Sequence, residues 1–169
     1  MMRRLLPIAL TVCIAFLLAA PLPTGARARA TACTAGRTTI DGKRAERFCG
    51  PATVALHMGQ FWVRLTGGSC AGTSTFFTVN VGTAVVAPNQ KVPYFGLTVG
   101  QFPNAPKTRK PAGTDGVYHL GVVVIRWHGG AWDISGWVRI TLWGDRTGGS
   151  FSGRTTAYPH RSISGTFSC

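Results

Sequence analysis

Most of the chain after residue 30 alternates apolar and polar positions in short runs that end at Gly, Pro, Asn or Asp. A two-residue period of this kind is typical of half-buried β-strands, and almost no segment after residue 30 repeats its apolar residues at helical spacing. Turn residues recur at the short intervals of an all-β domain. We therefore predict one all-β domain over residues 31–169, an antiparallel β-sandwich or barrel of about seven to nine strands.

The segment 54–66 alternates in two phases. Val54, Leu56 and Met58 are apolar at even positions, whereas the apolar residues that follow stand at the odd positions 61, 63 and 65. A shift of one residue turns a strand face over, so Gly59-Gln60 is predicted to be a bulge or a turn. Further strands are predicted over 77–81 and 95–99, and two closing strands around residues 151–153 and 163–169.

The segment 117–143 predicts a long β-hairpin. Gly129-Gly130 reads as a two-residue turn, which would place Arg126 opposite Asp133. One face would then be core and the other would carry an Arg126–Asp133 ion pair. The predicted core face holds Val123, Ile125, Trp127, Trp132, Ile134, Val138 and Ile140, with Trp127 facing Trp132 and Ile125 facing Ile134. The predicted opposite face holds Tyr118, Leu120, Val122 and Val124.

The first 30 residues have the pattern of a bacterial secretory signal peptide. A basic pair at residues 3–4 precedes an apolar run over 5–20, and residues 28–30 match the A-x-A cleavage pattern. A retained membrane anchor is the alternative, but the run is short for a span and is closed by two prolines. We expect residues 1–30 to be cleaved and the mature chain to be secreted or associated with the cell surface, without a transmembrane segment.

Cysteine usage supports export. Four of the five cysteines lie after residue 30, and an even number in an exported chain implies two disulfides. We predict the pairs Cys33–Cys49 and Cys70–Cys169, because Cys169 shares the inward phase of Ile163 and Phe167. A cysteine metal site is disfavoured, since none of these cysteines forms a C-x-x-C pair.

The mature chain is strongly basic. Residues 1–30 hold four of the 18 basic residues and none of the five acidic ones, which leaves a net charge of +9 on residues 31–169. Such a surplus favours contact with anionic cell-surface polymers, acidic glycans or other polyanions, although a merely soluble basic surface fits as well. Within the irregular segment 101–116, the basic residues Lys107, Arg109 and Lys110 indicate either a solvated loop or a binding loop.

No familiar catalytic signature is present. The chain lacks the nucleophile elbow, the H-E-x-x-H zinc motif, the phosphate loop and the dinucleotide fingerprint. Asp115 and Asp145 have the context of turn residues, and Asp133 is assigned to its ion pair. The four histidines, His57, His119, His128 and His160, are expected to be unrelated. We therefore expect no enzyme activity, no cofactor, no metal and no dedicated nucleic-acid motif.

The aromatic residues of the segment 133–143 are the strongest candidates for a binding site. Trp137, Arg139 and Trp143 share the face opposite the predicted core. Rings with an interleaved cation can stack on sugars or bases. The competing interpretation is that this face is a second buried surface, because Tyr118, Leu120, Val122 and Val124 share it.

The leading functional hypothesis is therefore a non-catalytic extracellular binding module for an anionic or glycan partner, or, as a variant, for another protein. Two alternatives remain open: a small barrel that encloses an apolar ligand, suggested by the apolar residues on both faces of the segment 120–125, and an unrecognised secreted hydrolase, suggested only by the four histidines.

The cleavage pattern generates the first testable prediction. The secreted protein should begin at Thr31, because residues 28–30 match the site that signal peptidase cuts. The intact mass of the secreted product measures this directly. A product that retains residues 5–20, or that carries lipid on Cys33, would contradict the predicted localisation.

Overall fold

The computed structural model describes residues 33–87, 91–101 and 110–169, except for the side chains of residues 136 and 137. The predicted signal peptide therefore lies outside the described residues. Within them the chain is all β, as predicted, and no helix has the length and apolar composition that a membrane span needs. The strands are β1 (Gly36–Ile40), β2 (Lys43–Arg47), β3 (Ala52–Met58), β4 (Phe61–Gly72), β5 (Phe76–Val85), β6 (Tyr94–Gly100), β7 (Gly116–Trp127), β8 (Gly130–Trp143), β9 (Gly148–Arg154) and β10 (Ser162–Ser168).

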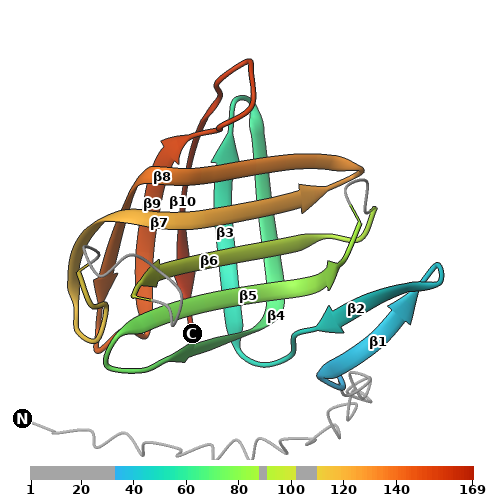
Figure 1. Ribbon diagram of the computed structural model, residues 1–169, viewed down its shortest axis with the longest axis horizontal. Helices are drawn as coiled ribbons and strands as arrows, with labels where there is room; N and C mark the ends of the chain where they lie inside the picture. The colour runs from blue at the N-terminus through green and yellow to red at the C-terminus, as the bar shows by residue number, and fades with distance from the viewer. Residues whose placement is uncertain (1–32, 88–90, 102–109) are drawn as a thin grey trace, which may run out of the picture. The chain divides into compact units, whose positions relative to one another are not determined.

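Strands β3 to β10 form a closed antiparallel barrel of eight strands. Neighbours pair in the order β5, β4, β3, β10, β9, β8, β7 and β6, and a β5–β6 pairing closes the ring. In Figure 1, β5 to β8 cross steeply over β3, β4, β9 and β10. The choice between sandwich and barrel is thus resolved as a barrel. The β1–β2 hairpin is an addition to it, attached through β2 to the far end of β5.

The barrel interior is filled by apolar side chains. Residues at alternate positions of every barrel strand are buried, which confirms the alternation read from the sequence. Aromatic rings meet across the interior: Phe95 of β6 and Phe151 of β9 have ring centroids 5.2 Å apart. The largest fully buried side chains are Phe95, Phe151, Leu56, Leu97, Ile125, Ile134, Ile140, Leu142, Ile163, Val54, Val79 and Val81.

The phase change at Gly59-Gln60 is a tight turn between β3 and β4. Met58 pairs with Phe61, so Gly59 and Gln60 form a two-residue connection, and Gly59 has a φ of +61°. A positive φ at this position is the conformation that glycine adopts without steric cost. The prediction of a bulge or a turn is confirmed as a turn.

The register predicted for the β7–β8 hairpin was wrong by two residues. The turn is His128-Gly129, not Gly129-Gly130, so Trp127 pairs with Gly130 and Ile125 with Trp132. His128 and Gly129 have φ of +49° and +82°, and two positive φ values are what a type I′ turn requires. An even shift keeps every residue on its predicted face.

The Arg126–Asp133 ion pair is nevertheless confirmed. Asp133 lies opposite Val124, one pair diagonal to Arg126, and both guanidinium Nη atoms of Arg126 bond the carboxylate, the longer contact being 3.3 Å. Diagonal neighbours on one sheet face are within reach of long side chains. The predicted core residues of this hairpin are buried where their side chains are described, except for Trp127 and Trp132, which are half-buried against the core.

Tyr118 does not lie on the outer face as predicted. The register of β7 against β8 shifts between Tyr118 and Leu120, and this shift turns Tyr118 inward, where only 3% of it is exposed. Its hydroxyl donates a hydrogen bond to the carbonyl of Thr114 at 2.6 Å. Sequence alternation alone does not locate such an irregularity.

Both predicted disulfides are confirmed. Cys33–Cys49 joins the two ends of the β1–β2 hairpin, and Cys70–Cys169 joins β4 to the end of the chain. Each pair has a Cα–Cα distance of 5.7 Å, in the usual range. A small disulfide-bonded β-barrel fits an extracellular domain.

The two disulfides should differ in their contribution to stability. They close loops with sequence separations of 99 and 16 residues. In the chain-entropy model a loop of ~100 residues is worth ~4.7 kcal/mol and one of ~15 residues ~3 kcal/mol. Replacing Cys70 and Cys169 together by Ala should thus lower the free energy of unfolding more than replacing Cys33 and Cys49. Urea denaturation of both double variants measures the difference, and the reverse order would contradict the model.

Candidate ligand-binding surface

The structure brings some of the predicted site residues together, places one apart and does not describe the side chains of the others. Arg139 and Trp143 both lie exposed on the outer face of β8. Trp137 pairs with Leu120 through its backbone, but its side chain is outside the described residues, as are Lys107 and Arg109. Lys110 lies elsewhere, with its ammonium 5.0 Å from the centre of the Tyr118 ring. The structure therefore keeps Arg139 and Trp143 together and separates Lys110 from them.

Strand pairing places Arg139 and Trp143 at the ends of two of three parallel rows of outward residues. Each row runs from β4 through β3, β10 and β9 to β8. The first row is Trp62, His57, Ser164, Ser152 and Arg139; the second is Arg64, Ala55, Thr166, Ser150 and Thr141; the third is Thr66, Thr53, Ser168, Gly148 and Trp143. We call this surface the trough.

The trough has large side chains on its walls and small ones on its floor. Most floor positions, on β3, β10 and β9, are Ser, Thr, Ala or Gly, whereas the walls on β4 and β8 carry Trp and Arg. Adjacent strands lie ~4.8 Å apart, so the walls are separated by roughly 19 Å along the sheet. The hollow around the first two rows, bordered by Trp62 and Arg139, has a volume of about 400 Å³.

Two indoles stand on opposite walls. Trp62 is 77% exposed and stacks on the His57 ring with centroids 4.5 Å apart. Trp143 is 45% exposed and lies over Gly148, where an added Cβ would be 2.7 Å from its Nε1 atom. Each indole is thus supported from below by its neighbour on the floor and keeps much of its surface open to solvent.

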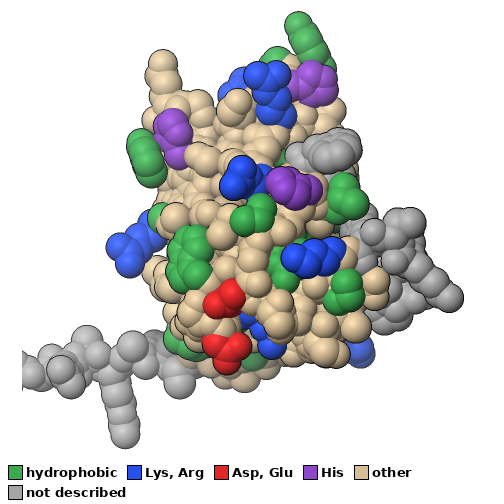
Figure 2. Space-filling model, turned by 90° about the vertical axis from the view of Figure 1, so that its left-hand side faces the viewer, with side chains coloured by type: hydrophobic (Ala, Val, Ile, Leu, Met, Phe, Trp, Pro, Cys, Tyr) green, Lys and Arg blue, Asp and Glu red, His purple; other side chains and the backbone are tan. Residues whose placement is uncertain are grey.

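The cations of the trough are not neutralised by ion pairs. Arg64 and Arg139 on the walls, and Arg154 and Arg161 near one end, are exposed and form no ion pair with any described carboxylate. On the face that Figure 2 shows, Lys and Arg side chains are spread out, and the acidic side chains visible there lie in its lower half. The trough therefore presents positive charge that is free to meet an anion.

On the outer face of β5 and β6 the polar groups bind one another, as Thr53 and Ser168 do in the third row of the trough at 2.9 Å. Tyr94 donates to Asn80 Oδ1 at 2.8 Å, and Asn80 donates to Thr78 Oγ1 at 3.2 Å. Burial raises the pKa of the Tyr94 phenol above its usual range; Glu46 raises it further and Arg126 lowers it. In the first two rows, by contrast, the hydroxyls of Ser152, Ser164 and Thr166 form no side-chain hydrogen bond to another described residue.

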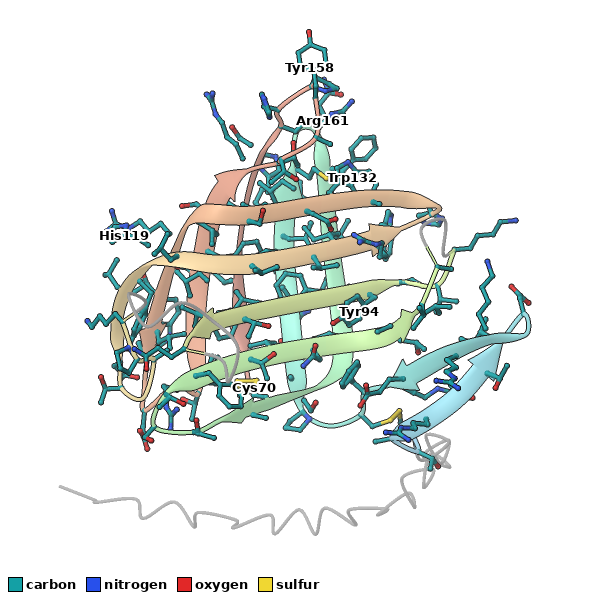
Figure 3. All side chains as sticks on the ribbon, in the orientation of Figure 1. Cys70, Tyr94, His119, Trp132, Tyr158 and Arg161 are labelled. Carbon is teal, nitrogen blue, oxygen red and sulfur yellow. A yellow bond between two sulfur atoms is a disulfide. The ribbon has the colours of Figure 1, made fainter. Side chains whose placement is uncertain are left out.

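A loop with internal hydrogen bonds stands at one end of the trough. The side chain of Thr155, at the base of the β9–β10 connection, accepts from the backbone N–H of Arg161 at 2.9 Å and donates to the carbonyl of Ala157 at 3.2 Å. Figure 3 shows Tyr158 and Arg161 projecting with this loop beyond the barrel, and Tyr158 is 90% exposed. The loop therefore borders the trough at this end.

The four histidines do not lie together in one site. His57 lies on β3, His119 on β7, His128 in the β7–β8 turn and His160 in the β9–β10 loop, and the described residues contain no group of three or more metal-ligating side chains. Asp115 accepts hydrogen bonds from the backbone N–H groups of Asp145 and Arg146 at 3.0 and 2.7 Å, so its carboxylate binds the distant β8–β9 turn and not a turn of its own.

Half of the trough was missed by the sequence analysis. The odd residues 61, 63 and 65 identify the apolar face of β4, and the even residues Trp62, Arg64 and Thr66 must then lie on the other. That face repeats the Trp-and-Arg pattern of β8, which was a usable signal.

Comparison of the chain with protein-family models, curated proteins and solved structures gives no match, so the site rests on its own geometry.

The trough tryptophans should contribute little to stability. Trp62→Ala and Trp143→Ala should each change the free energy of unfolding by less than ~1 kcal/mol, because exposed side chains contribute little to folding. The buried Phe151→Ala is the matched control and should cost ~3–5 kcal/mol. Urea denaturation measures all three. A loss comparable with that of Phe151→Ala would make the two indoles structural.

Proposed function

We propose that this chain is a non-catalytic extracellular module that binds an anionic or glycan partner in the trough. The observation that carries the proposal is the arrangement of the three rows: a floor rich in hydroxyl groups lies between walls that carry exposed indoles and unpaired guanidinium groups. Disulfides and small size fit an extracellular domain.

Electrostatics favours an anionic partner. A guanidinium group offers a planar set of donors that matches carboxylates, sulfates and phosphates. Arg126 is already satisfied by Asp133, whereas Arg64 and Arg139 have no such partner among the described residues. Several exposed cations on one face of the barrel also attract polyanions and raise their local concentration at the surface.

The barrel favours binding without rearrangement. Trough residues stand on paired strands above a packed interior, so little backbone entropy is lost when a ligand binds. The same packed interior supplies no observation in favour of an enclosed apolar ligand. The separate positions of the four histidines likewise supply none in favour of a hydrolase.

Affinity for a polyanion should fall with salt, and the Arg139→Ala variant tests where the polyanion binds. Loss of one exposed ion pair is worth up to ~1 kcal/mol, or roughly a fivefold loss of affinity at 0.1 M salt. The effect should vanish near 1 M salt, where the Debye length is ~3 Å. Retention of the mature protein on sulfated dextran across a salt gradient measures it.

Arg37→Ala is the matched control, because it removes the same charge from the exposed outer hairpin. It should shift the elution salt less than Arg139→Ala. Equal shifts would mean that net charge alone drives binding. A protein that is retained neither on sulfated dextran nor on neutral dextran would contradict the proposed function.

A further inference from the structure

We infer that the ligand of the trough is a linear acidic polysaccharide, with sugar rings stacked on Trp62 and Trp143 and its acid groups bound by Arg139 and Arg64. This inference rests on the proposed function and narrows its ligand to one chemical class. It follows from the positions of the rings and the cations on the walls of the trough and of the hydroxyl groups on its floor.

The trough contains the same pair of groups twice, in opposite orientation. In the first row an indole on β4, Trp62, faces a guanidinium on β8, Arg139. Further along, the order is reversed: the guanidinium of Arg64 is on β4, and the indole of Trp143 is on β8. Arg64 and Trp143 border one shared hollow. Each wall thus carries one indole and one guanidinium, Trp62 with Arg64 on β4 and Trp143 with Arg139 on β8. Two such ring-plus-cation subsites fit a ligand that repeats a ring and a charge.

Each indole is held as a platform with one side covered. Trp62 rests on the His57 ring, and Trp143 rests on the glycine at position 148, the one floor residue without a side chain. A supported ring with an open surface can stack on a flat or ring-shaped ligand. An inorganic polyphosphate has no rings and would leave both platforms unused.

The floor between the subsites is suited to sugar hydroxyls. Ser152, Ser164 and Thr166 occupy it, and a hydroxyl group both donates and accepts hydrogen bonds. A single-stranded nucleic acid needs a basic groove that follows its phosphates. Here the middle of the trough is neutral and the cations stand on the walls, so the acidic polysaccharide is the better match.

The two subsites lie on opposite walls, roughly 19 Å apart, so a ligand that reaches both must be a chain. Trp62 and Arg64 are two residues apart on β4, and Arg139 and Trp143 are four apart on β8. At ~3.4 Å per residue these separations are roughly 7 and 14 Å. A ligand that reaches both subsites gains from the second as an intramolecular contact. Affinity should therefore rise steeply once an oligosaccharide is long enough to span them.

The test compares three probes that separate rings from charge. Polygalacturonate carries one carboxylate per sugar ring, its methyl ester keeps the rings without the charge, and inorganic polyphosphate keeps the charge without the rings. Binding of each to the mature protein is measured by fluorescence or calorimetry at low and high salt. Polygalacturonate should bind at least about tenfold more tightly than the other two, because only it uses both groups of each subsite.

Tryptophan variants identify the rings. Trp62→Ala and Trp143→Ala should each weaken polygalacturonate binding on the order of 10-fold or more at all salt concentrations, since stacking does not depend on charge. Trp62→Tyr and Trp143→Tyr keep a ring and should restore most of the affinity. Gly148→Ala should reproduce part of the Trp143→Ala loss, because its methyl group would displace the indole. Urea denaturation of every variant verifies that it folds.

The outcomes separate the inference from the proposed function. If polyphosphate binds as tightly as polygalacturonate and the Ala variants bind normally, the trough is a general polyanion site: the inference is overturned and the proposed function stands. Single-stranded DNA serves as a fourth probe, and if it binds more tightly than every polysaccharide, the inference is likewise overturned. If no probe binds at all, the proposed function fails as well.

Discussion

Closure of the sheet through the β5–β6 pairing is the constraint on which the rest of the structure depends. Once the ring is closed, every barrel strand has one face inside and one outside. The interior is then packed with apolar side chains, and the alternate residues are committed to solvent. The trough exists because the outward residues of five successive strands are small in the middle and large at both sides.

Much of this arrangement could be read from local sequence. The two-residue period predicts the strands and their inward faces, and the inward phase of Cys169 predicts its disulfide. The Arg126–Asp133 pair was predicted correctly from a wrong register, because diagonal positions on one face are also in contact. An error of two residues preserves the faces, whereas an error of one would have inverted them.

Long-range pairing could not be read in this way. The sequence places Arg139 and Trp143 on one face of β8, but no local pattern indicates that Ser152, Ser164 and Trp62 continue the same row. The inward position of Tyr118 depends on a register shift that alternation hides. The β1–β2 hairpin was not recognised either, since its short strands are mostly polar and exposed.

The Cys70–Cys169 bond has a consequence for resistance to proteolysis. It turns the chain from β4 to its last residue into a covalent ring that contains the whole of β5 to β10. A protease that cuts a surface loop within this ring opens the ring but releases no fragment. Both pieces stay attached through the sulfur bridge while the barrel pairing holds them in register. A nicked molecule can thus keep the trough strands assembled, and two cuts within the ring are needed to detach any part of it.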